Sequence, residues 1–71
     1  MADLTRKEVE EMVSRGESLA GADLSGLDLR GVNLEGANLA RANLHKATLH
    51  IAKLRGANLT GTIMPDGSKH E

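Results

Sequence analysis

Apolar residues recur along most of this chain with a period of five. From Leu19 onward every fifth residue is leucine or methionine, and ten such positions follow one another without a slip. These positions, called centres below, are Leu19, Leu24, Leu29, Leu34, Leu39, Leu44, Leu49, Leu54, Leu59 and Met64. Two residues before a centre the chain is usually alanine, one residue before it is usually Asp or Asn, and two residues after it is usually glycine. Such self-similarity predicts a repeat architecture with the centres in its core.

The period of five fits neither an α-helix nor a flat strand. On a helix five residues advance by about 500°, so the centres would spiral around the surface. On a strand an odd spacing places successive centres on opposite faces. Every centre faces inward if the chain turns through about a quarter of a circle in each repeat, with glycine at the corners. Four repeats then close a square coil, and coils stack at about 4.8 Å, so the sequence predicts an all-β solenoid.

Several repeats resemble a known family motif. The runs GADLSG, GANLAR and GANLTG resemble the A(D/N)LXX motif of pentapeptide-repeat proteins, and the resemblance covers about residues 18–65. The ending TGTIMPDGSKHE is similar to that of small bacterial, especially cyanobacterial, members. The resemblance implies a right-handed quadrilateral parallel β-helix, here of about two and a half coils. One departure is that no centre is Phe, a residue that many members use there.

A short helix is predicted ahead of the repeats, over about residues 6–15. Thr5 and Glu8 have the spacing of a capping box. Val9, Met12 and Val13 form a short apolar stripe at helical spacing. Because the terminal units of a solenoid are normally caps, we expect this stripe to close the first coil.

The chain is therefore expected to divide into three segments. These are a capping helix over 1–16, the β-solenoid over 17–65 and a polar C-terminal tail over 66–71. No cap is predicted for the C-terminal coil, so we expect this end to pack on a protein partner, most simply a second copy in a homodimer. The candidate interface residues are Ile51, His50, Leu59, Ile63 and Met64.

Two surface features carry expectations of their own. Ile51 occupies a corner where glycine is usual, and this fits either a stray apolar residue or part of a contact patch with His50. Because residues twenty apart should stack, Glu35 is expected to form an exposed ion pair with Arg55.

The amino-acid composition excludes several classes of protein. The chain has no Cys, Phe, Tyr or Trp and a net charge of −1. It therefore lacks a disulfide framework, a thiolate metal site and the aromatic platform of single-strand nucleic-acid binders. Its N-terminal segment carries charges throughout, and no apolar run has the length of a signal peptide or a membrane span. We expect a cytoplasmic protein that binds neither nucleic acid nor membrane.

No arrangement of polar residues predicts catalysis. His45 and His50 fall on adjacent faces with no third ligand, and Asp23 and Asp28 likewise fall on different faces. The evenly spaced glycines lack the Gly-Lys-Ser of a phosphate loop. We expect no enzymatic activity, no metal, no cofactor and no small-molecule substrate.

Two functions remain from the sequence. The first is a non-catalytic structural or protein-interaction module, a scaffold that docks on a partner or associates with itself. The alternative is DNA mimicry, because some pentapeptide-repeat proteins bind DNA gyrase by imitating duplex DNA with a long acidic rod. Residues 22–64 hold three acidic and five basic side chains, and the solenoid is short, so this alternative is disfavoured.

Overall fold

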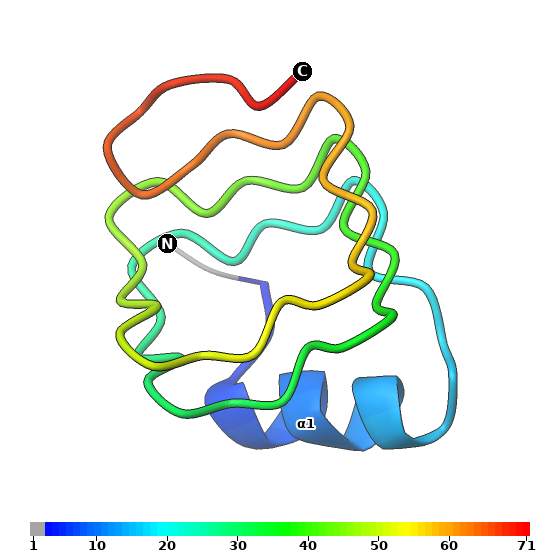
Figure 1. The fold of residues 1–71 in the computed structure, drawn as a ribbon. Helices are drawn as coiled ribbons and strands as arrows, with labels where there is room; N and C mark the ends of the chain where they lie inside the picture. Colours follow the sequence, from blue (N-terminus) through cyan, green and yellow to red (C-terminus); the bar gives the residue numbers. More distant parts are fainter. Residues whose placement is uncertain (1–2) are drawn as a thin grey trace.

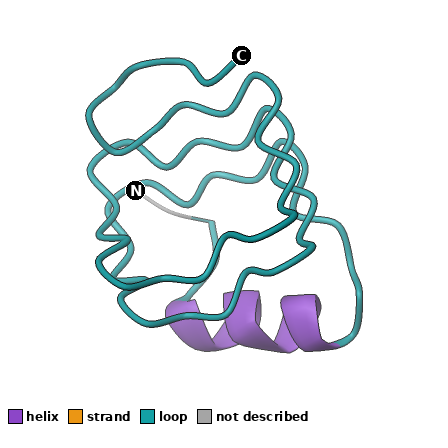
Figure 2. Ribbon diagram, viewed as in Figure 1, coloured by secondary structure: helices purple, strands orange, loops and turns teal. Residues whose placement is uncertain are grey.

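The protein, seen in a computed structural model that describes residues 3–71, consists of one helix followed by stacked layers of extended chain (Figure 1). The helix, α1, spans Arg6–Ser14. The first two residues of the predicted capping segment lie outside the described part. Figure 2 shows the layers as loops, because their backbones meet in isolated bridges and form no longer strand among residues 3–71.

The layers repeat every twenty residues. Parallel bridges join residues twenty apart, each one residue before a centre: Asp23 with Asn43, Asp28 with Thr48, Asn33 with Lys53, Asn38 with Asn58, and Asn43 with Ile63. We define the first layer as 19–38, the second as 39–58 and the partial third as 59–64. Centre N–H groups donate to the next layer; the Leu24 N–H, for example, donates to the Asn43 carbonyl oxygen at 2.8 Å. Four repeats therefore complete one layer.

Each corner is a four-residue turn that needs a positive φ. At the first corner the Ala22 N–H donates to the Leu19 carbonyl oxygen at 3.1 Å, and Gly21 between them has a φ of 72°. A positive φ at the third residue is the mark of a type II turn, which glycine adopts without a steric penalty. The corner geometry therefore explains the glycine in most repeats.

Where Asp or Asn precedes a centre, its side chain stabilises the corner that follows. The side-chain oxygen of Asn43 accepts a hydrogen bond from the His45 N–H at 2.9 Å, and Asn58 does the same with the Thr60 N–H at 3.1 Å. Such bonds from a side chain to the backbone two residues on hold turns, and Asp and Asn are the residues that make them.

The interior is a ladder of leucines that is best covered at its N-terminal end. The fully buried centres are Leu19, Leu24, Leu29, Leu34, Leu39 and Leu44. Val9 of α1 is also fully buried in this cluster, and Met12 and Val13 pack against it. The remaining centres, Leu49, Leu54, Leu59 and Met64, are half-buried because no complete layer follows them.

Helix α1 begins at a capping box and is tied to the first layer. The Glu8 N–H donates to Thr5 Oγ1 at 3.2 Å, and the Thr5 N–H donates to Glu8 Oε1 at 2.9 Å. The Asp3 N–H donates to the Asp23 carbonyl oxygen at 2.8 Å, and Arg6 Nη1 donates to the Asp28 carbonyl oxygen at 3.1 Å. These last two bonds occupy carbonyl groups that a preceding layer would otherwise bind.

The C-terminal residues fold back on the third layer. The chain reverses after Met64, where the Gly67 N–H donates to the Met64 carbonyl oxygen at 2.8 Å. Lys69 then forms an antiparallel bridge with Ile63, and the His70 N–H donates to the Thr62 carbonyl oxygen at 2.7 Å. Residues 66–71 are exposed, but their backbone pairs with residues 61–64 and so closes part of the last layer.

Candidate functional site

The C-terminal edge of the stack, from the second half of the second layer to the first residue of the third, carries backbone groups that nothing in the described chain binds. We call the segment 49–59 the open edge. Within residues 3–71, the N–H groups of Leu49, Ile51, Leu54, Gly56 and Leu59 have no acceptor. The equivalent N–H groups one layer earlier, such as those of Leu29 and Leu34, donate to the second layer at 2.8 Å. The open edge is therefore a row of free donors set in the geometry of a parallel bridge.

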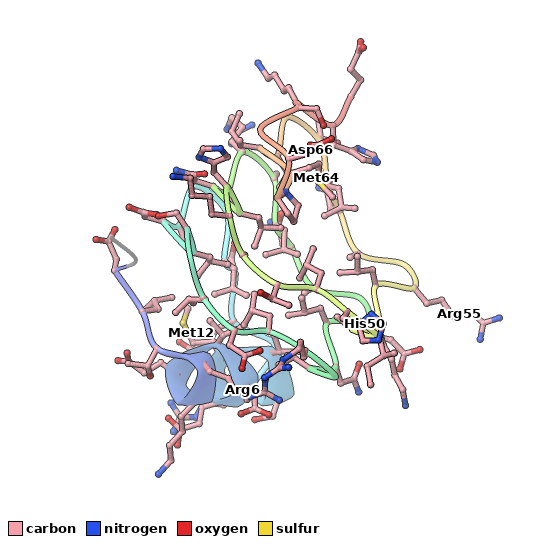
Figure 3. All side chains as sticks on the ribbon, turned by 90° about the vertical axis from the view of Figure 1, so that its left-hand side faces the viewer. Arg6, Met12, His50, Arg55, Met64 and Asp66 are labelled. Atoms are coloured by element: carbon pink, nitrogen blue, oxygen red, sulfur yellow. The ribbon has the colours of Figure 1, made fainter. Side chains whose placement is uncertain are left out.

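The side chains of the open edge divide into an apolar inner row and a polar outer row. The inner row is half-buried and consists of Leu49, Ala52, Leu54, Ala57 and Leu59. The outer row is exposed and consists of His50, Ile51, Lys53, Arg55 and Asn58. Figure 3 shows Arg55 extending away from the body on the side opposite α1. The edge thus offers both unpaired backbone and apolar surface to another molecule.

The residues expected at the interface separate into two groups. Ile51, His50 and Leu59 belong to the open edge. Ile63 and Met64 do not, because Ile63 is bridged to Lys69 and the Met64 N–H donates to the Ser68 carbonyl oxygen at 2.7 Å. The folded-back tail therefore removes the backbone of Ile63 and Met64 from the exposed edge.

Ile51 lies in a conformation that isoleucine rarely adopts. Its φ is 54°, and 74% of the residue is exposed. A methyl group added to Gly31, the corner above it, would lie 3.9 Å from Ile51 Cδ1, so the side chain covers that glycine. A β-branched residue with positive φ is strained, and such strain is concentrated at functional sites.

The ion pair expected between Glu35 and Arg55 is absent. The salt bridges found in residues 3–71 lie near α1 and the first layer, and neither Lys53 nor Arg55 takes part in one. Both are exposed surface side chains, which gain little from pairing and lose rotamer freedom. The cations of the outer row are therefore free for another molecule.

Three carboxylates have lowered pKa values, and all three belong to turns. The Arg30 side chain donates to Asp28 and lowers the pKa of that carboxyl to about 2. The Ser25 hydroxyl lowers the pKa of Asp23, and the Ser68 hydroxyl lowers that of Asp66. In each case the partner lies two residues further along the chain, so these shifts reflect local turn geometry.

Within residues 3–71, neither histidines nor acids gather into a further site. Among the described residues, no three His, Cys, Asp or Glu side chains are placed to hold a metal ion. No helix in the described chain is long and apolar enough to cross a membrane.

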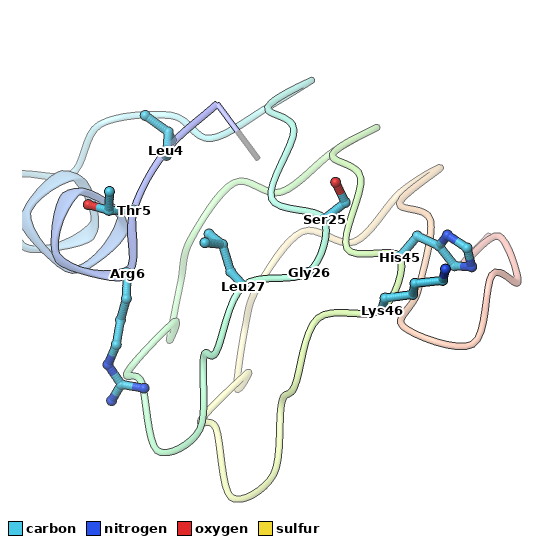
Figure 4. A pocket seen from close by; sticks show the side chains of 8 residues that line it. All are labelled: Leu4, Thr5, Arg6, Ser25, Gly26, Leu27, His45 and Lys46. Atoms are coloured by element: carbon cyan, nitrogen blue, oxygen red, sulfur yellow. The ribbon is translucent and has the colours of Figure 1, made fainter. Parts of the chain in front are cut away.

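A groove of about 730 Å³ runs between the start of α1 and the Ser25–Leu27 corner (Figure 4). Leu4 and Leu27 line it with apolar surface, and Arg6 and Lys46 lie toward its two ends. It is wide open, and the Arg6 guanidinium is already bonded to the Asp28 carbonyl oxygen. A groove with so few free and convergent polar groups is poorly suited to a small molecule.

Charge is segregated along the stack, a feature that the inspection of motifs did not reveal. Residues 1–35 contain four basic and eight acidic side chains, a formal charge of −4. Residues 36–71 contain five basic and two acidic side chains, a formal charge of +3, and no acidic residue lies between Glu35 and Asp66. Because the chain advances along the stack, α1 and the first layer are acidic and the later layers are basic. Counting the charged residues separately in the two halves of the sequence would have revealed this segregation.

Comparisons with known proteins identify the repeat. A solved structure is similar to this chain: HetL, a pentapeptide repeat protein involved in heterocyst differentiation regulation, from the cyanobacterium Nostoc sp. strain PCC 7120. The identity is 54% and the TM-score 0.75, over 76% of this chain and 23% of HetL, so the match spans less than a quarter of that protein. The comparison with curated proteins yields no match.

The family model for pentapeptide repeats matches eight copies over residues 18–61. The identity of the repeat inferred from the motif runs is thereby confirmed, and the fold that this family implies is the right-handed quadrilateral β-helix. The chain belongs to the pentapeptide-repeat family.

Proposed function

We propose that this chain is a non-catalytic protein-interaction module that docks a protein at its open edge. In this proposal the layers are two and a half coils of β-helix, α1 caps the N-terminal end, and the segments divide at 1–16, 17–65 and 66–71. The observation that carries the proposal is the row of five unpaired N–H groups above half-buried leucines.

An unpaired edge of this kind is a template for another chain. Proteins either shield such an edge from other chains or use it to bind a strand from a partner. Here the N-terminal end has α1, Asp3 and Arg6 against it, and the tail covers Gly61 to Met64. The segment 49–59 has neither form of protection within the described chain, which supports a role in binding.

The likeness to HetL supports a regulatory role for this binding. HetL is involved in the regulation of heterocyst differentiation, and pentapeptide-repeat proteins are generally structural. We therefore propose that the chain acts through its contacts with another protein and not through catalysis. A cytoplasmic location is part of the proposal, and the lack of cysteine fits a compartment in which disulfides are rare.

A second copy is the simplest partner and the second candidate. The half-buried Leu54 and Leu59 would be covered if two open edges met. DNA mimicry gains no support, because the 30 residues that follow Glu35 contain no acidic side chain.

Site-specific photo-crosslinking in cells tests the docking proposal. A photo-reactive amino acid replaces Ile51 in one variant and Asn33, an exposed residue of the first layer, in a matched control. We expect a discrete adduct from position 51, none from position 33, and loss of the adduct when Leu54→Asp is added. An adduct at twice the mass of the chain identifies a second copy. Equal labelling from both positions, or none from position 51, contradicts docking at this edge.

A further inference from the structure

We infer that the open edge binds an extended segment of another protein in which apolar residues alternate with Asp or Glu. This inference rests on the proposed docking function and specifies the chemistry of the partner. According to this inference, the open edge binds an acidic strand of a different protein and not the open edge of a second copy.

The outer row of the open edge is cationic and unpaired. Lys53 and Arg55 are exposed, and neither forms an ion pair within residues 3–71. His50 lies in the same row, and the sequence holds no acidic residue between Glu35 and Asp66. A strand that binds here therefore meets positive charge on its outer face.

The alternation of the partner follows from the alternation of the edge. Leu54 faces inward, and its neighbours Lys53 and Arg55 face outward. Residues that lie opposite one another in paired strands share a face, with Cβ atoms about 4.5–5.5 Å apart. A partner strand thus places an apolar side chain over Leu54 and its flanking residues beside Lys53 and Arg55. Acidic residues at those flanking positions match the edge, since opposite charges across a pair are favourable.

A second copy offers no surface of this kind. Two open edges would bring Lys53 and Arg55 of one chain near those of the other, and like charges across a pair are destabilising. The opposite end of a second copy is acidic, but its edge carbonyl groups at Asp23 and Asp28 already accept bonds from Asp3 and Arg6. The acidic end of a second copy is therefore partly occupied by its own N-terminal segment, and its open edge carries positive charge.

Synthetic peptides test the inference directly. The probe is a fluorescein-labelled peptide with the sequence Gly-Asp-Leu-Asp-Leu-Asp-Leu-Gly, and fluorescence anisotropy reports its binding to the purified chain. One control peptide has Lys in place of Asp, and another has the same composition with the three Asp and three Leu in separate blocks. We expect the alternating acidic peptide to bind on the order of tenfold more tightly than either control, because each misplaced charge removes a cross-strand pair.

Charge-reversed variants locate the binding. Lys53→Glu combined with Arg55→Glu should reverse the preference, so that the Lys peptide binds more tightly than the Asp peptide. Arg41→Glu with Lys46→Glu is the matched control, because it changes the net charge equally at exposed corners whose backbone N–H groups already donate to Thr60 and Pro65. This control should keep the original preference. If the first variant fails to fold, Lys53→Gln with Arg55→Gln should abolish the preference and its dependence on salt.

The outcomes separate this inference from the docking proposal. Concentration-dependent dimerisation that Leu54→Asp abolishes, with no preference for the acidic peptide, overturns the inference and leaves docking at the open edge intact. Failure to bind any peptide, together with a monomer at all concentrations and no adduct from position 51, overturns both. Equal effects of the two charge-reversed variants also overturn the inference, because they indicate general electrostatic attraction.

Discussion

The Arg6 guanidinium donates a hydrogen bond to the Asp28 carbonyl oxygen, 3.1 Å away and 22 residues along the chain. Arg6 also lies 3.7 Å from the Asp28 carboxylate. In the second layer the equivalent carbonyl oxygen, that of Thr48, accepts a hydrogen bond from the Leu29 N–H of the layer before it. The Arg6 side chain, in the first turn of α1, therefore takes the place of the N–H group that a preceding layer would supply.

Removing this side chain should weaken the N-terminal end. We expect Arg6→Met, which keeps much of the aliphatic length, to lower the free energy of unfolding by about 1 kcal/mol, since the bond involves a charged group that is partly exposed. Lys7→Met is the control, because Lys7 is exposed and forms no salt bridge within the described chain. Urea unfolding followed by circular dichroism measures both. Equal losses in the two variants would contradict a role for the Arg6–Asp28 bond.

Asp28 should make stability depend on acid pH. The hydrogen bond from the Arg30 side chain lowers the pKa of Asp28 from 3.8 to about 2 in the folded chain. The stabilisation is therefore complete above the unfolded pKa of about 4 and is lost as the pH falls to about 2. Asp28→Asn, which keeps an acceptor for the Arg30 N–H, should show a shallower fall in the free energy of unfolding over this range. Parallel curves for the variant and the parent chain would show that Asp28 does not contribute.

The features that sequence patterns predicted are those that arise within one or two repeats. The period of five follows from the corner turn, and residues such as Gly21 and Asn43 show it locally. The link between Thr5 and Glu8 is equally local.

The features that were missed depend on contacts between distant segments. The pairing of Lys69 with Ile63 has no periodic signal, although Gly67 stands one residue later than the repeat would place it and so marks a different turn. The prediction of a Glu35–Arg55 ion pair was wrong because stacking fixes only the positions of the backbones. The exposed side chains remain free to adopt rotamers that do not bring their charges together.

A substitution at Ile51 should have opposite effects on stability and on binding. We expect Ile51→Gly to raise the free energy of unfolding by about 1 kcal/mol, because glycine adopts the φ of 54° without a steric penalty. The same variant should bind the alternating acidic peptide more weakly, because it loses an exposed apolar side chain of the open edge. Thermal unfolding and anisotropy measure the two effects. A variant that is less stable than the parent chain would contradict the strain argument.

Thr62 should stabilise the third layer through a buried hydrogen bond. Its hydroxyl donates to the Leu39 carbonyl oxygen at 2.6 Å, and the residue is 0% exposed at a position where most repeats have alanine. We expect Thr62→Val, which keeps the shape, to lower the free energy of unfolding by about 1 kcal/mol. Thr60→Val, at an exposed position of the same layer, should change it by less than about 0.5 kcal/mol. Similar values for the two variants in urea unfolding would show that the bond contributes nothing.

Amide hydrogen exchange, followed by NMR, determines whether the N–H groups of the open edge are unpaired. In dilute protein the Leu29 and Leu34 amides, which donate to the second layer, should be protected. The Leu49, Leu54 and Leu59 amides, which have no acceptor in residues 3–71, should exchange rapidly and become protected when the alternating acidic peptide is added. Strong protection of these three amides in the dilute chain alone would mean that the edge is already paired, and it would contradict docking at this edge.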